Sequence, residues 1–148
     1  MTTTATLADV KRYWSTHVND IEVIKAPIGS AEFLEELIRY RYEKMPYLRD
    51  IVTSGSLQGK HILEVGCGPG VDLVHLASVG GRVTAVDLTP EAVSLARRHL
   101  EVRGLRNATV QESNAERLPF DEGTFEVVYS HGVLHHTVDT QGAIDEVW

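Results

Sequence analysis

The stretch Glu64-Val65-Gly66-Cys67-Gly68-Pro69-Gly70 decides the fold of this chain because of the segments that flank it. A short apolar run, His61-Ile62-Leu63, leads into it, and a helix-like stretch, 71–78, follows it. A second apolar run, 83–86, then ends in the acid Asp87. Glycines let a backbone turn tightly and come close to a ligand, and a carboxylate at the end of the second strand can accept both hydroxyl hydrogens of a ribose. The pattern predicts a βαβ unit with a nucleotide site.

The details of the glycine loop favour a nucleoside with a positively charged tail over a dinucleotide. A dinucleotide fingerprint needs a third glycine where this chain has Val71, and Pro69 removes a backbone N–H that could bind a phosphate. Glu64, on the strand that leads into the loop, would repel a phosphate and attract a cation. A nicotinamide-dependent oxidoreductase is therefore the less favoured alternative.

Four motifs, taken in order and spacing, resemble those of the class I S-adenosylmethionine-dependent methyltransferases, in the methyltransferase type 11 (UbiE-like) group. They are the glycine loop 64–70, the pair Asp87-Leu88, the loop 114–120 (N-A-E-R-L-P-F) and the segment 125–131 (F-E-V-V-Y-S-H). The resemblance is specific from about Gly59 to Trp148. It implies an α/β fold with a Rossmann-like, doubly wound, mainly parallel sheet and N-terminal helices.

The resemblance also implies S-adenosyl-L-methionine as the cofactor and S-adenosyl-L-homocysteine as the product. Asp87 would bind the ribose and Leu88 would flank the adenine. Asn114 stands where the family usually has an aspartate, and it would accept the adenine amine through its carbonyl oxygen. Without the charge, we expect weaker cofactor binding. The residues expected at the cofactor are Glu64, Gly66, Cys67, Gly68, Gly70, Asp87, Leu88, Asn114, Ala115, Glu116, Ser130 and His131.

Three histidines, His131, His135 and His136, follow the fourth expected strand. They lack a fixed ligand pattern such as H-E-x-x-H, so the sequence favours no metal site. His135 or His136 is the candidate general base for an acceptor that must lose a proton. A polar rim with no role in proton transfer explains the same residues equally well.

The chain divides into two expected parts, an N-terminal helical lid over residues 1–55 and a cofactor-binding, Rossmann-like part over residues 56–148. Helical periodicity and an N-cap at Ser30 predict the lid's main helix. Helices are expected over 7–17, 30–45, 47–52 and 71–78, from 90 to Gly104 and from 137 onward, strands over 61–65, 82–87, 108–112 and 125–130, and a loop over 19–29.

Four side chains of the expected lid could face a positively charged cofactor. An aromatic ring attracts a cation to its face, so an aromatic lid suits a sulfonium. Ordinary packing of the same aromatic residues is an equally good explanation. The residues are Tyr13, Trp14, Arg41 and Tyr42.

The bulk properties exclude several classes of protein. The 148 residues carry a formal net charge of -7, which argues against tight binding to a nucleic-acid backbone. The single cysteine excludes an internal disulfide framework. No apolar run has membrane-spanning length, and residues 1–6 show no signal pattern. We therefore expect a cytoplasmic protein that acts on a small-molecule methyl acceptor, without a membrane partner. The motifs do not specify the acceptor.

The family resemblance ends early in the expected sheet. The family has seven strands, whereas this chain reaches the fourth strand and part of the next helix at Trp148. The chain therefore resembles a truncated methyltransferase, and a cofactor-binding fragment without catalytic activity is the second alternative. An apolar edge strand invites pairing, so the segment Val127-Val128-Tyr129 predicts a homodimer that covers this edge.

Overall fold

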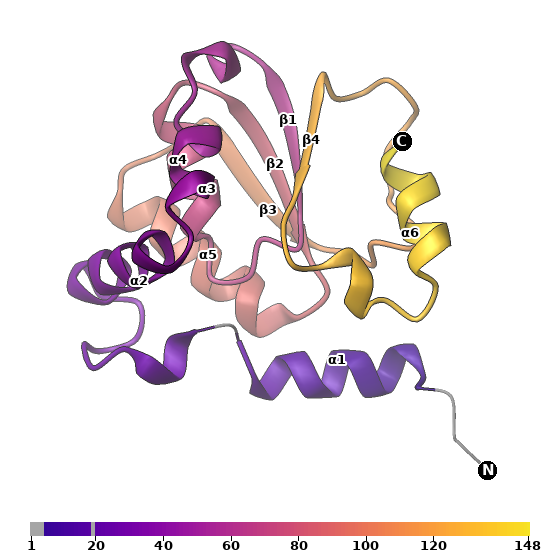
Figure 1. Ribbon diagram of the computed structural model, residues 1–148, viewed down its shortest axis with the longest axis horizontal. Coiled ribbons are helices and arrows are strands. Elements are labelled where there is room, and N and C mark those ends of the chain that lie inside the picture. Colours follow the sequence, from indigo (N-terminus) through magenta and orange to yellow (C-terminus); the bar gives the residue numbers. More distant parts are fainter. Residues whose placement is uncertain (1–4, 19) are drawn as a thin grey trace.

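The computed structural model describes residues 5–18 and 20–148. Residues 1–4 of the expected lid, and Asn19 at the start of the expected loop, lie outside these ranges. Within the described residues, a four-stranded parallel sheet with the order β3-β2-β1-β4 forms the centre of the molecule (Figure 1). Its strands are β1 (His61–Val65), β2 (Arg82–Asp87), β3 (Ala108–Glu112) and β4 (Val127–Ser130).

The register places the carboxyl ends of three strands side by side. Glu64 on β1 lies next to Ala85 on β2 and Tyr129 on β4. β1 is central, and four of its five residues are buried. A strand that is buried on both sides is typical of a parallel sheet with both faces covered.

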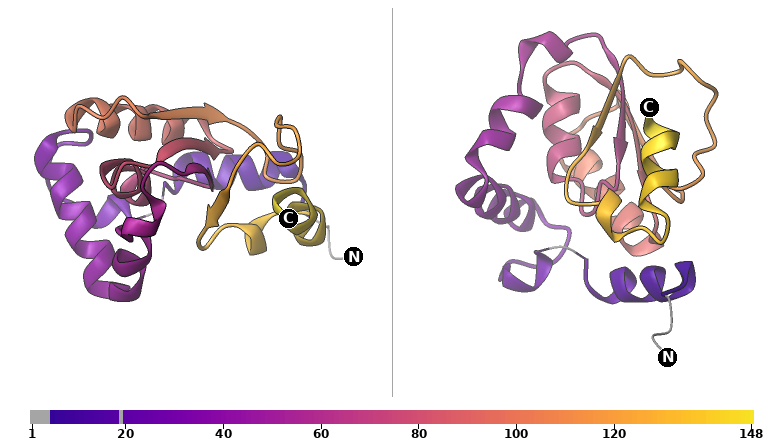
Figure 2. Two further views of the ribbon diagram at one scale, coloured as in Figure 1. Left: turned by 90° about the horizontal axis from the view of Figure 1, so that it is seen from above. Right: turned by 45° about the vertical axis from the view of Figure 1, so that its right-hand side comes forward.

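Helices cover both faces of the sheet (Figures 1 and 2). The six α-helices of the described residues are α1 (Leu7–Thr16), α2 (Ala31–Lys44), α3 (Pro46–Val52), α4 (Val71–Ser78), α5 (Pro90–Val102) and α6 (Thr140–Val147). On one face, α2 to α5 pack with Ile62 of β1 and Ala85 of β2 in the main apolar cluster. On the other face, α6 packs with Leu63 and Val65 in a second cluster. Because side chains of a strand alternate between faces, β1 contributes to both.

The expected lid consists of two structurally different pieces. Phe33 and Leu37 of α2, and Leu48 and Val52 of α3, belong to the main apolar cluster, so these helices are part of the domain's core. In contrast, α1 contains no buried residue and lies across the carboxyl edge of the sheet (Figure 1).

The ends of the helices follow local hydrogen bonds. The Ser30 side chain accepts the Phe33 N–H, so the predicted N-cap of α2 is confirmed. The last helix begins at Thr140 rather than at 137, because the Asp139 carboxylate accepts the Gly142 N–H and caps it there. Three short 3-10 helices complete the described elements: η1 (Ile21–Val23), η2 (Gly55–Leu57) and η3 (Leu134–His136).

The fourth strand begins two residues later than expected, at Val127. Phe125 packs edge-on against Phe120, with ring centroids 5.0 Å apart, so it belongs to the packing of the second cluster. None of the helices in residues 5–18 and 20–148 has the length and apolar character of a membrane span.

Candidate cofactor site

A cavity of about 220 Å³ opens at the carboxyl edge of the sheet, beneath α1. It lies where the chain order reverses between β1 and its two neighbours, which is the usual ligand position in open α/β sheets. Of the predicted cofactor residues, the cavity is lined by Glu64, Gly66, Cys67, Gly68, Asp87, Leu88, Asn114, Ala115, Glu116 and His131. Gly70 and Ser130 are not among its lining residues, and of the two candidate bases only His136 is.

The glycines of the loop after β1 have separate roles. Gly66 has a φ of 77°, and a Cβ on it would lie 2.3 Å from a methyl group of Val133. Gly68 has a φ of 52° with open space around it, so the backbone can approach a ligand there. Gly70 faces away from the cavity, since a Cβ on it would lie 3.0 Å from the Ala96 Cα on α5. Its role is therefore close packing between helices, a role that sequence reasoning had not separated from ligand contact.

Asp87, at the end of β2, is held in a fixed orientation. One carboxylate oxygen accepts the Gly68 N–H at 2.9 Å, and the other accepts the N–H and the hydroxyl of Thr89, each at 3.0 Å. A carboxylate has about four acceptor positions, so at least one remains for a ribose hydroxyl. Asp87, the residue predicted to bind the ribose, is thus hydrogen-bonded directly to the glycine loop.

The segment after β3 is held by hydrogen bonds from its own side chains to backbone N–H groups. The Asn114 side-chain carbonyl accepts the Glu116 N–H at 3.1 Å, which leaves its second lone pair for another donor. The Glu116 carboxylate accepts the N–H groups of Val138 and Asp139 at 2.7 and 3.3 Å. Glu116 therefore joins this segment to the start of α6, and contact between Asn114 and an adenine stays a prediction.

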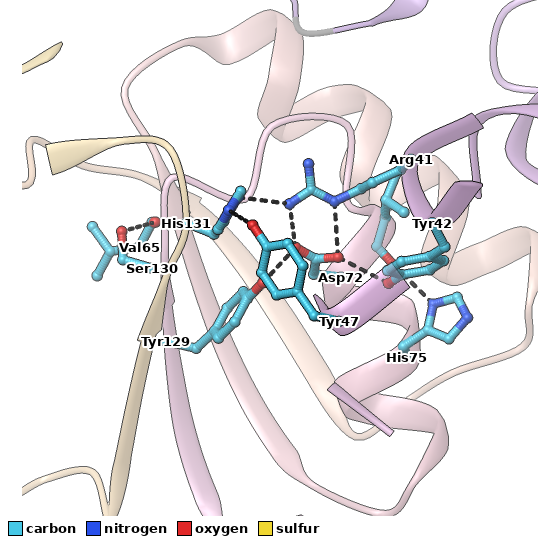
Figure 3. Close-up of polar contacts among 10 residues, drawn as sticks. Arg41, Tyr42, Tyr47, Val65, Asp72, His75, Tyr129, Ser130 and His131 are labelled. Carbon is cyan, nitrogen blue, oxygen red and sulfur yellow. Dashed lines mark hydrogen bonds and ion pairs between the residues drawn. The ribbon is translucent and has the colours of Figure 1, made fainter. Parts of the chain in front are cut away.

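Asp72 on α4 is the centre of a buried polar network that the sequence analysis missed (Figure 3). Its two oxygens accept the Arg41 guanidinium in a two-pronged pair, at 3.0 and 2.5 Å. They also accept the hydroxyls of Tyr42 and Tyr129, each at 2.8 Å. Burial alone would raise the pKa of Asp72, but the Arg41 hydrogen bonds and charge outweigh it and lower the pKa. Asp72 is therefore ionised and joins α2, α4 and β4.

His131, which lines the cavity, extends this network, and Figure 3 shows its contacts. Its Nδ1 lies 3.4 Å from the Arg41 guanidinium and its Nε2 lies 3.2 Å from the Tyr47 hydroxyl. Burial, and then the charge of Arg41, lower the pKa of His131, which favours its neutral form. Its neighbour Ser130 donates its hydroxyl to the Val65 carbonyl at 3.0 Å, so this side chain stabilises the β1–β4 pair.

Glu64 lines the cavity, and one of its carboxylate oxygens has no hydrogen-bond partner in the described part of the chain. The residue is 3% exposed, and its Oε2 is fully buried without a hydrogen bond. Burial, and then the negative charge of Asp72, raise the pKa of this carboxyl well above its usual range. A buried polar atom without a partner is rare and marks a place where a ligand could donate.

One side of the cavity is formed by α1 and the segment after β4. Leu7, Val10 and Trp14 line it from α1, and Trp14 lies edge-on to His136 with 5.0 Å between the ring centroids. Burial, and then His135, lower the pKa of His136.

The four predicted lid side chains differ in position. Trp14 and Arg41 line the cavity, whereas Tyr42 is buried at Asp72. Tyr13 is 53% exposed and stacks on His17. Among the described residues, no group of three or more His, Cys, Asp or Glu side chains could hold a metal ion.

Residues 62–148 match the profile of a family described as a methyltransferase domain. The chain belongs to the S-adenosylmethionine-dependent methyltransferases. Among curated proteins, the ubiquinone biosynthesis O-methyltransferase of Methylocella silvestris is 36% identical over 114 residues, which are 76% of this chain and 43% of that protein. The chain thus spans less than half the length of that relative.

Two solved structures show the same arrangement of elements. The YcgJ protein of Bacillus subtilis is 26% identical, with a TM-score of 0.64, over 70% of this chain and 44% of that one. A magnesium protoporphyrin IX methyltransferase from Synechocystis PCC 6803 with bound SAM is 21% identical, with a TM-score of 0.71 over 99% of this chain and 73% of that one; this likeness shows the fold.

The comparisons decide three of the sequence predictions. S-adenosyl-L-methionine is the cofactor of this family, so the predicted family, its cofactor and the α/β Rossmann-like fold are confirmed. The family membership also sets aside the nicotinamide-dependent alternative.

Proposed function

We propose that this chain provides the cofactor-binding part of an enzyme that transfers the methyl group of S-adenosyl-L-methionine to a small-molecule hydroxyl. The observation that carries the proposal is the cavity itself, where the oriented Asp87 and the unpartnered Glu64 line the same space at the ends of β2 and β1. Asp87 offers an acceptor for a ribose, and Glu64 offers one for a cationic group.

The residues present fit this cofactor. Gly68 lets the backbone approach a nucleoside, and Leu88 and Ala115 line the cavity beside it as apolar neighbours for a base. Arg41 is the only Lys or Arg among the described residues that line the cavity, and its guanidinium suits a carboxylate. When bound, the cofactor supplies a methyl group that is already electrophilic, so the protein acts mainly by holding the two reactants in line.

The relatives and the lining of the cavity support a small, largely apolar acceptor with a hydroxyl. The curated relative is named for O-methylation in ubiquinone biosynthesis. In this chain the α1 side of the cavity is lined by Leu7, Val10 and Trp14, and the net charge of -7 disfavours nucleic acid as the acceptor. His136 lines the same side with a lowered pKa, so in its neutral form it can accept the hydroxyl proton.

Titration calorimetry with S-adenosylhomocysteine tests the cofactor site. A hydrogen bond to a charged acceptor contributes about 1.5–3 kcal/mol, so we expect Asp87→Ala to weaken binding by about 10- to 100-fold. Asp50→Ala, at an exposed acid on α3, is the matched control and should bind like the wild type. Circular dichroism checks that each variant folds. Equal affinity of the Asp87 variant and the wild type, or no binding by the folded wild type, would contradict the proposed site.

The pair His136→Gln and His135→Gln tests the acceptor side. Methyl transfer to a panel of phenols and amines is measured with labelled cofactor. A general base typically contributes 10²- to 10⁴-fold, so we expect a loss of roughly this size in kcat for His136→Gln and little change for His135→Gln. Equal losses in the two variants, or transfer to amines alone, would overturn the assignment.

A further inference from the structure

Glu64 is an unusual carboxyl group because no donor among the described residues bonds its buried oxygen. It lies on the central strand β1, its Oε2 is fully buried, and no donor of residues 5–18 or 20–148 reaches that atom. An ionised carboxylate in such a place is strongly disfavoured, because burial removes the water that stabilises the charge. Asp72 and Asp87 line the same cavity, but each has donors from several groups. Glu64 differs from both in this respect.

The charges around Glu64 favour its protonated form. Arg41 is the nearby positive charge, but its two-pronged pair is directed at Asp72, which two tyrosine hydroxyls also bind. The acids at Asp72 and Asp87 both oppose ionisation of Glu64. The titratable and charged groups that face it are Asp72 from α4, Arg41 from α2, Asp87 from β2, Tyr129 from β4 and Cys67 from the glycine loop.

We propose that Glu64 carries a proton in the free protein and releases it to solvent when a ligand brings a cationic amino group into the cavity. The O–H bond of the Glu64 carboxyl breaks, the proton passes to the buffer, and the carboxylate that remains pairs with the ammonium group. This inference rests on the proposed function, because the ligand it concerns is the amino-acid tail of the cofactor or its product.

The direction of the pKa shift agrees with this geometry. Burial, and then Asp72, raise the pKa of Glu64 in the free protein, while a bound cation would lower it again. At pH values below the pKa that Glu64 has in the free protein, an ammonium ligand must displace one proton from Glu64. The affinity for that ligand then falls about tenfold for each unit that the pH is lowered. A nucleoside that lacks the amino group displaces no proton, and its affinity lacks this dependence.

Calorimetry in two buffers measures the released proton directly. The 148-residue chain is titrated with S-adenosylhomocysteine at pH 6.5 in phosphate and in imidazole, whose ionisation enthalpies differ widely. The difference in observed enthalpy, divided by the difference in ionisation enthalpy, gives the number of protons released. We expect a positive value, at most one, for the wild type and a value near zero for Glu64→Gln, which keeps the shape of a protonated glutamate. Glu126→Gln, at an exposed glutamate paired with Lys60, is the control and should keep the wild-type value.

A second ligand tests the role of the amino group on the wild-type protein. 5′-Methylthioadenosine keeps the nucleoside and the thioether but has no amino group, so we expect its binding to the wild type to release no proton. The proposal is overturned if S-adenosylhomocysteine releases no proton, if Glu64→Gln releases as many as the wild type, or if methylthioadenosine does. If neither ligand binds at all, it is the proposed function that fails.

Discussion

Glu64, Asp72 and Asp87 line one cavity, yet their surroundings place them in different states. Asp72 accepts Arg41 and two tyrosine hydroxyls and is held ionised. Asp87 accepts backbone and hydroxyl donors of the two loops that meet at the cavity and is held in position. Glu64 accepts no hydrogen bond on its buried oxygen from any residue that the structure describes. The hydrogen-bond partners of each acid, and not the residue type, therefore decide whether it binds other groups of the protein or remains able to bind a ligand.

A second buried group, His99 on α5, is hydrogen-bonded to the glycine loop. It is 0% exposed, its Nδ1 lies 2.5 Å from the Pro69 carbonyl, and its Nε2 is buried without a partner among the described residues. Because the carbonyl can only accept, Nδ1 carries a proton, and an Nε2 without an acceptor favours the neutral ring. Burial lowers the pKa of His99 from its ordinary value of 6.5.

We expect the stability of the protein to fall in acid through His99. Below about pH 6.5 the unfolded chain binds a proton at His99, whereas the folded chain does not. The contribution of neutral His99 to the free energy of unfolding is therefore complete above that pH and is lost as the pH falls towards the pKa of the folded state. The slope contributed by one such group is at most about 1.4 kcal/mol per pH unit. Urea unfolding between pH 7.5 and 5 measures it, and His99→Gln should reduce the slope.

The control for this prediction is His17→Gln, at an exposed histidine that packs on Tyr13. It should keep the wild-type dependence on pH. If His99→Gln and the wild type lost stability in parallel as the pH fell, the buried histidine would not be the group responsible.

At the scale of the elements, the sequence predicts what depends on near neighbours along the chain. The strand 61–65, the glycine loop and the helix 71–78 were all predicted with their observed bounds, because apolar periodicity and glycine spacing are local signals. The network at Asp72 was not predicted, because Arg41 lies 31 positions away and Tyr129 lies 57 positions away. Only the packing of α2 and β4 against α4 brings these three groups together.

The position of Gly70 between α4 and α5 can be tested by one added methyl group. Its φ is 84°, and a Cβ there would lie 3.0 Å from the backbone of Ala96. An L-residue with this φ costs roughly 1–2 kcal/mol, and overpacking adds about 1–3 kcal/mol. We therefore expect Gly70→Ala to lower the free energy of unfolding by about 2–5 kcal/mol, measured with urea.

Gly104 provides the matched control at the end of α5. It also has a positive φ, 64°, but no atom lies within 4 Å of the place where a Cβ would stand. Gly104→Ala should therefore cost only the backbone strain, about 1–2 kcal/mol. Equal losses in the two variants would show that contact with α5 is not what requires glycine at position 70.

At the scale of the whole molecule, the sheet order β3-β2-β1-β4 leaves β4 at one edge of the described sheet. Helices cover both faces of this sheet, but no described strand pairs with the outer side of β4 (Figure 1). The strand is short and apolar, and its Val128 is 39% exposed. Unpaired backbone groups on such an edge are a template for another strand, so we propose that two copies of the 148-residue chain pair there.

The pairing should depend on concentration and on the edge strand itself. We expect light scattering to show a dimer that accumulates as the protein is concentrated, and Val128→Lys to shift it towards the monomer, because a charge on an edge strand opposes pairing. Ile28→Lys replaces an apolar residue that is 69% exposed in the loop before α2, so it adds the same charge away from the edge and should leave the dimer intact. A monomer at every concentration would exclude the dimer. The same loss of dimer in both variants would place the interface elsewhere, since only an edge-to-edge pair needs the β4 backbone to be accessible.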